Sequence, residues 1–213
     1  MKKQIKIIIS LGAIMAIIGI MFLSLFLYSL PGLRLLPKEK ITTIDGITTI
    51  GDAVKYFKST ELEGWEMVEA VQKFTAKKMP YSRRNPWDFP SRAFSRGMGY
   101  CYQYNIALHI IFKRLGIQSR PVQTFKAEFP PSQIHGMPCE GGITSHAWLE
   151  VTVDGETKNV CAGDINNSPG KNNFKIVGEV TGFNSFFQAF TWLGGILVNQ
   201  YRDRRALKEF KGI

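Results

Sequence analysis

The sequence predicts an α+β domain, in which helices pack on an antiparallel sheet, preceded by one membrane-spanning helix. From residue 101 to Gly116, inward-facing residues recur at steps of three and four, the spacing of one helical face. They are Cys101, Tyr104, Leu108, Ile111 and Leu115. Ser145 to Val153 instead alternates strictly between apolar and polar residues, as a half-buried strand does, and Asp154-Gly155 follows as a hairpin signal. A helix and a hairpin of this kind are typical of an α+β fold.

Composition limits the function classes. The chain has 213 residues, of which 45% are hydrophobic and 21% charged, which suits one folded domain with appendages and excludes a disordered chain. The net charge is +10, yet the basic residues are spread along the chain and no zinc-finger, homeodomain or RRM pattern is present. We therefore expect no nucleic-acid partner, and an anionic membrane surface or acidic cell envelope as the counterpart of this charge.

The N-terminal segment has the features of a membrane anchor. Residues 7–30 contain no charged residue, and as a helix they would span about 36 Å, enough to cross a hydrocarbon core of ~30 Å. A cleaved signal peptide has a shorter apolar stretch and a small-x-small site, which the exit Tyr28-Ser29-Leu30-Pro31 does not offer. We predict a single uncleaved anchor over residues 1–30, with the short N-terminus in the cytoplasm and the domain outside it.

The rest of the chain divides into three parts. Residues 31–60 contain helix-breaking prolines and a Thr/Ile-rich stretch, which we interpret as a tether. The domain is predicted over residues 61–182. Residues 183–213 combine an apolar helical stripe with a basic tail, typical of an amphipathic helix docked on the domain or lying at a membrane surface. A second membrane span is the weakest alternative, because its apolar core is short and contains polar residues.

Within the domain, apolar periodicity predicts a helix from about Glu63 to Lys78. A proline- and glycine-rich loop is expected over Tyr81 to Gly99, and a strand over Ile117 to Phe125. A long loop is expected over Lys126 to Thr144, and the return strand of the hairpin over Thr157 to Cys161.

Two side chains are candidates for nucleophilic chemistry. Cys101 falls in the first turn of its predicted helix, and a helix N-terminus favours the thiolate form of a cysteine. His146 stands near the start of the alternating strand and could serve as its base. From the residues alone, the alternative is that the cysteine is a small buried hydrophobe and the histidine a satisfied polar residue.

Two motifs carry a family resemblance. They are Gly99-Tyr100-Cys101-Tyr102-Gln103-Tyr104-Asn105, followed by Leu115-Gly116-Ile117 and Arg120, and Ser145-His146-Ala147-Trp148-Leu149-Glu150-Val151. The first resembles the nucleophile helix of the transglutaminase-like superfamily, and the second resembles its His-Ala-Trp-x-Glu-Val strand. The resemblance covers about Trp65 to Asp164. It implies a papain-like core, a Cys-His-Asp triad and acyl transfer through a thioester. We expect no cofactor, and no metal because Cys and His are too few and not at ligand spacing.

The third member of the triad is the point of departure from the family. The family's aspartate falls at Cys161 in this chain, so Asp164 is the nearest carboxylate and Asn159 an alternative. A two-residue hairpin loop would put Asn159 and Cys161 on the His146 face and turn Asp164 away. A three-residue loop with a bulge would set Asp164 opposite His146. We favour Cys101, His146 and Asp164 as the catalytic residues, because a carboxylate stabilises an imidazolium.

The predicted function is that of a membrane-anchored, transglutaminase-like cysteine enzyme acting on amide bonds of proteins or peptides, by hydrolysis or acyl transfer. One alternative is an impaired module of the same family that binds peptide or glycan at the cell surface. Another is a membrane-tethered scaffold whose working part is the basic tail. Cys139 and Cys161 could form a disulfide if the domain lies outside the cytoplasm.

Overall fold

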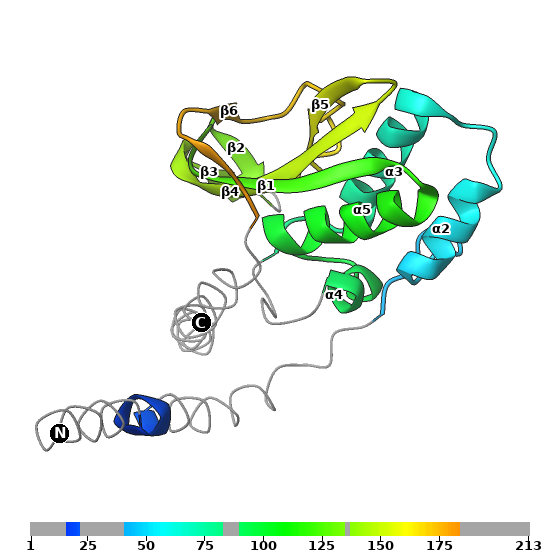
Figure 1. Ribbon diagram of the computed structural model, residues 1–213. Coiled ribbons are helices and arrows are strands. Elements are labelled where there is room, and N and C mark those ends of the chain that lie inside the picture. The colour runs from blue at the N-terminus through cyan, green and yellow to red at the C-terminus, as the bar shows by residue number, and fades with distance from the viewer. Residues whose placement is uncertain (1–15, 22–40, 83–89, 135–136, 184–213) are drawn as a thin grey trace, which may run out of the picture. The chain divides into compact units, whose positions relative to one another are not determined.

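The computed structural model describes residues 16–21, 41–82, 90–134 and 137–183 (Figure 1). The described residues fall into two units, one that contains residues 16–21 and one that contains residues 41–82, 90–134 and 137–183. In the first unit, residues 16–21 are helical. The second unit holds every other described residue, and the fold below is that of this unit.

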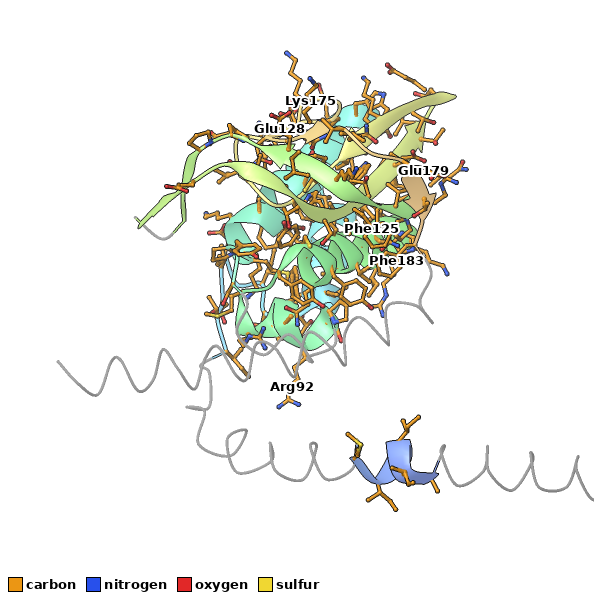
Figure 2. All side chains as sticks on the ribbon, turned by 90° about the vertical axis from the view of Figure 1, so that its left-hand side faces the viewer. Arg92, Phe125, Glu128, Lys175, Glu179 and Phe183 are labelled. Carbon is orange, nitrogen blue, oxygen red and sulfur yellow. The ribbon has the colours of Figure 1, made fainter. Side chains whose placement is uncertain are left out.

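A five-stranded antiparallel sheet forms one layer of the domain. Its strands are β1 (Gln118–Phe129), β4 (Gly142–Val153), β5 (Glu156–Val160), β6 (Lys175–Ile176) and β7 (Val180–Gly182). The order is β5-β4-β1-β6, and β7 pairs with another part of β1. Glu128 on β1 pairs with Lys175 on β6, and Figure 2 shows the two side chains side by side at this edge of the sheet. Opposite charges at a cross-strand pair favour this register.

Four helices form the second layer. They are α2 (Ile50–Lys58), α3 (Gly64–Lys78), α4 (Pro90–Arg96) and α5 (Cys101–Leu115). Helix α5 lies directly against the sheet beneath β1, and the other three helices pack around it (Figure 1). The fold confirms the predicted α+β class with the cysteine-bearing helix packed on an antiparallel sheet.

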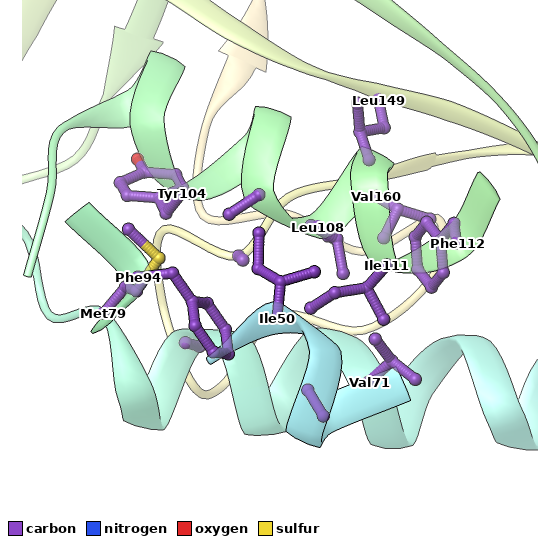
Figure 3. Packing of buried hydrophobic residues seen from close by; sticks show 14 of the residues in the cluster. Ile50, Val71, Met79, Phe94, Tyr104, Leu108, Ile111, Phe112, Leu149 and Val160 are labelled. Atoms are coloured by element: carbon purple, nitrogen blue, oxygen red, sulfur yellow. The ribbon is translucent and has the colours of Figure 1, made fainter. Parts of the chain in front are cut away.

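The hydrophobic core lies between α5, the sheet and the surrounding helices. Leu108, Ile111 and Phe112 of α5 are fully buried and face Val71 of α3 in Figure 3. Leu149 of the sheet completes the opposite side of the cluster. Because α5 is enclosed on several sides, its first turn is fixed relative to the sheet, and Cys101 begins that turn.

The strongest periodic segments have the predicted limits. Helix α3 runs over Gly64–Lys78 and α5 over Cys101–Leu115, both within one residue of expectation. Gly116 ends α5 with a φ of 83°, a left-handed conformation that glycine adopts without steric cost. Strand β4 contains the whole predicted strand and starts three residues earlier, at Gly142.

Three predicted irregular segments contain regular structure. The loop predicted over residues 81–99 contains helix α4. The loop predicted over residues 126–144 contains the end of β1, the hairpin of β2 (Ser132–Ile134) and β3 (Met137–Cys139), and the start of β4. The predicted tether contains α2, which is part of the core. Prolines and short apolar runs concealed these elements, since a proline at a helix start or strand edge is compatible with both.

No helix among the described residues is long and apolar enough to cross a membrane. The predicted anchor lies outside the described residues except for residues 16–21, and the predicted C-terminal helix lies outside them after Phe183.

Candidate active site

Cys101 is the first residue of α5. Tyr100 before it is extended, with φ −95° and ψ 177°, and its backbone N–H donates to Oε1 of the buried Gln103 at 3.3 Å. This bond satisfies a backbone donor at the helix start and fixes the direction in which the chain enters α5. The Cys101 side chain is half-buried and packs against the edge of the hydrophobic core.

Gly99 permits this tight entry. Its carbonyl accepts from the Ser82 backbone N–H at 2.9 Å, which ties the start of α5 to the chain leaving α3. A Cβ at Gly99 would lie 2.9 Å from both Cβ of Gln103 and Cε of Met79. Any larger residue would therefore push the first turn of α5 away from α3, so the Gly-x-Cys motif has a steric basis here.

His146 lies on β4 among aromatic rings. The Phe174 ring packs edge-on at 4.5 Å and the Phe129 ring at 5.0 Å between centroids, while Trp148 stacks at 6.2 Å. The side chain is only 6% exposed. This burial lowers the pKa of His146 from 6.5 to about 4, so the imidazole is neutral at physiological pH and can accept a proton.

The hairpin between β4 and β5 has the two-residue register. Val153 pairs with Glu156 and Leu149 with Val160. Asp154 and Gly155 both have positive φ, 51° and 80°, as a type I′ turn requires. Of the two registers left open by the sequence, this is the one that turns Asp164 away from the His146 face.

Cys161 occupies the third position beside the histidine. It is fully buried immediately after the end of β5, and its Sγ lies 3.3 Å from Nε2 of His146. Burial raises the pKa of the Cys161 thiol to about 12, against a smaller lowering effect of the hydrogen bonds from Asn105 and the Gly163 backbone. Cys161 is therefore a neutral thiol at physiological pH.

Asp164 and Asn159 bond elsewhere. The Asp164 carboxylate accepts from the backbone N–H of Asn166 at 2.8 Å and from the side-chain amide of Asn173 at 3.3 Å. Oδ1 of Asn159 accepts from Nε1 of Trp148 at 2.8 Å. Within the described residues, neither side chain hydrogen-bonds to the imidazole.

Asn105 joins the nucleophile helix to the other two groups. It lies one turn after Cys101 on α5, and its Nδ2 donates to the Ala147 carbonyl at 2.6 Å and to Sγ of Cys161 at 3.5 Å. Its Oδ1 accepts from the Ala162 backbone N–H at 3.0 Å. One buried amide therefore fixes α5 to β4 beside the histidine and to the segment that carries Cys161.

The sequence reasoning did not assign a role to Asn105 or Phe174. Asn105 had a usable signal, because it lies four residues after Cys101 and so on the same face of the helix. Phe174 had none, since only the return of the chain after β5 brings it to His146.

The sequence left open a disulfide between Cys139 and Cys161, but Cys161 is a free thiol in the structure. Its sulfur lies against His146 and Asn105, in a buried position on the inner side of the domain. Within the described residues, no group of three or more His, Cys, Asp and Glu side chains could hold a metal ion.

The structure is an α+β domain with a cysteine at the start of a packed helix and a buried histidine on the adjacent sheet, as the sequence resemblance implied. Residues 51–157, half of the chain, match the transglutaminase-like superfamily. The chain belongs to that superfamily. No curated protein matches the chain significantly.

Several solved structures are similar to this chain. A candidate cysteine protease from Cytophaga hutchinsonii is 15% identical, with 63% of this chain and 47% of that chain covered and a TM-score of 0.42. A TGase is 15% identical, with 63% and 36% covered and a TM-score of 0.39. The M. smegmatis arylamine N-acetyl transferase is 17% identical, with 57% and 47% covered and a TM-score of 0.39. The chain spans less than half the length of each.

Proposed function

We propose that the protein is a membrane-anchored cysteine enzyme that cleaves or transfers amide bonds of proteins or peptides through a thioester. Cys101 is the nucleophile and His146 the base. The observation that carries this proposal is the link through Asn105, which joins the helix that begins with Cys101 to the strand segment that bears His146. A thiol and an imidazole held on rigid elements are the minimum for nucleophilic catalysis by cysteine.

The first half-reaction forms the thioester. The Cys101 sulfur attacks the amide carbonyl while its proton passes to the neutral imidazole of His146. The tetrahedral oxyanion lies at the N-terminus of α5, where backbone N–H groups of a helix start stabilise negative charge. The carbon–nitrogen bond then breaks, and the imidazolium returns the proton to the leaving amine.

The second half-reaction regenerates the thiol. Water or a second amine attacks the thioester carbonyl and gives its proton to His146, and the carbon–sulfur bond breaks as the proton returns to Cys101. Water yields the acid and an amine yields a new amide, so both outcomes use the same residues. The protein's own role is to position Cys101, hold a neutral base beside it and stabilise the oxyanion.

The proposal places this chemistry at a membrane surface. Residues 7–30 carry no charge and the chain has a net charge of +10, which favours an anionic surface. A domain tethered there would meet substrates of the cell envelope if it lies outside the cytoplasm.

Trapping the acyl-enzyme tests the proposal. The full-length chain in detergent is treated with p-nitrophenyl acetate, and the acetylated peptide is located by mass spectrometry. We expect rapid acetylation of Cys101, absent in Cys101→Ala and slowed at least ~100-fold in His146→Ala, the usual size of a general-base contribution. Cys101 acetylation no faster than that of a free thiol, and unchanged in His146→Ala, would contradict it.

A peptide- or glycan-binding module is the second candidate. The observation that favours it is the thiol of Cys161 against Nε2 of His146, at the position where the family carries a carboxylate. For a binding module we expect Cys101 to be acetylated no faster than a free thiol, with the same rate in His146→Ala.

A further inference from the structure

The contact between Cys161 and His146 is part of a built arrangement. Both side chains are buried, and no closer polar contact of the imidazole exists among the described residues than the 3.3 Å from Nε2 to Sγ. The Cys161 carbonyl accepts from Nε2 of Gln72 at 3.0 Å and from Nδ2 of Asn167 at 3.1 Å. Two buried amides therefore fix the backbone from which the thiol projects.

Several donors converge on the same sulfur. Nδ2 of Asn105 donates to Sγ at 3.5 Å and the backbone N–H of Gly163 donates to it at 3.4 Å. Gly163 has to be small, because a Cβ there would lie 2.6 Å from the Tyr104 hydroxyl oxygen. The surroundings of Cys161 thus present N–H groups to an acceptor, as a site for the orienting group of a triad should.

The direction of the His146 bond decides its chemistry. A neutral imidazole has one N–H, and the nitrogen without it is the base. We infer that Cys161 is the positioning residue for His146: its sulfur accepts the Nε2–H, which leaves Nδ1 unprotonated as the base for Cys101. The inference gives the thiol the place of the missing carboxylate. Its catalytic meaning rests on the proposed function, but the tautomer is a property of the folded protein alone.

A thiol in this place orients the imidazole without supplying a negative charge. Within the described residues, the titratable group that hydrogen-bonds to the imidazole is the Cys161 thiol, which burial keeps neutral. The Asp164 carboxyl group hydrogen-bonds to Asn166 and Asn173 instead of to the imidazole. The imidazolium is therefore formed only during the reaction, and a carboxylate introduced at position 161 should stabilise it.

The first test uses the wild-type chain. Histidine is labelled with ¹⁵N in the full-length protein in detergent, and the His146 signals are assigned by their loss in His146→Gln. We expect the Nε2–H tautomer at neutral pH and a midpoint of titration well below the ordinary 6.5. An Nδ1–H tautomer, or titration at the ordinary value, would overturn the inference even if no variant of Cys161 folded.

The second test separates positioning from packing. Cys161→Asp should raise the titration midpoint of His146 by at least about one unit, as a neighbouring carboxylate does. Cys161→Ala should slow acetylation of Cys101 about tenfold or more, since losing the correct tautomer slows a triad enzyme by up to ~10⁴. Cys161→Ser, which keeps an acceptor, should recover most of the rate.

The outcomes distinguish the two proposals. If Cys101 is acetylated and Cys161→Ala keeps both the rate and the pH profile of the wild type, Cys161 only fills space and this inference fails alone. If Cys101 is inert while His146 has the Nε2–H tautomer and responds to Cys161→Asp, the proposed enzyme fails and the positioning role stands.

Discussion

A single amide, that of Asn105, bears on both the stability of the domain and the arrangement of the site. It is 1% exposed and bonds to two backbone groups, the Ala147 carbonyl and the Ala162 N–H. Truncation to alanine leaves these two backbone groups buried without the amide as their partner, which costs about 1–3 kcal/mol for each group. We expect Asn105→Ala to lower the free energy of unfolding by ~2–5 kcal/mol in urea denaturation.

The matched control is Asn166→Ala. Asn166 is exposed and bonds only to Asp164 among the described residues, so its loss should change stability by less than about 1 kcal/mol. Equal effects at the two positions would show that the Asn105 bridge is not stabilising.

The burial of His146 makes the free energy of unfolding depend on pH. Its pKa is about 4 in the folded protein against 6.5 ordinarily, because the charged form is buried. Above pH 6.5 the His146 imidazole is neutral in both the folded and the unfolded chain, so its burial does not lower the stability. As the pH falls through 6.5 the unfolded chain takes up a proton first, so stability decreases until about pH 4, by about 3 kcal/mol at most.

The difference between wild type and His146→Gln isolates this effect. Urea denaturation at pH 4.5 and 7.5 should show a smaller loss on acidification in the variant, because glutamine does not titrate. A loss of the same size in both proteins would mean that His146 keeps its ordinary pKa when folded.

At the scale of elements, α2 extends the domain into the segment predicted as a tether. Phe57 of α2 is 3% exposed and packs edge-on against Phe74 of α3 at 5.6 Å between ring centroids. Removing a buried phenylalanine ring costs ~3–5 kcal/mol. We expect Phe57→Ala to reduce the free energy of unfolding by that amount. Tyr56→Ala, next to it but 48% exposed, should cost much less.

The helices differ in how far their limits can be predicted from their own residues. Helix α5 was predictable at both ends, because a long apolar stripe and a glycine cap act within the segment. Helix α2 begins with the pair Thr49 and Asp52, whose side chains each accept from the other's backbone N–H, but it was concealed by its length of nine residues. Short helices gain their stability from tertiary packing, which the sequence does not display.

The candidate site, like the fold, was predictable from the sequence only in part. Cys101 and His146 are predictions from motifs, and the family match covers the segment that contains them. The third position depended on hairpin register, where one residue of loop length moves every later side chain to the other face. Asp154 and Gly155 adopt the two-residue turn that their types favour, and Cys161 rather than Asp164 reaches the imidazole.

At the scale of the whole molecule, the proposed membrane location rests on the segment before the domain. Residues 7–30 are uncharged, and Ile14 and Ile18 lie near their middle. We expect the full-length chain to pellet with membranes and to resist carbonate extraction. Lysine near the centre of a span costs about 2.5–3.5 kcal/mol relative to an apolar residue, so Ile14→Lys with Ile18→Lys should release most of the protein. Glu61→Lys, an exposed change to the same residue type within the domain, should release none. Recovery of the wild-type chain in the soluble fraction, or equal extraction of all three proteins, would refute the anchor.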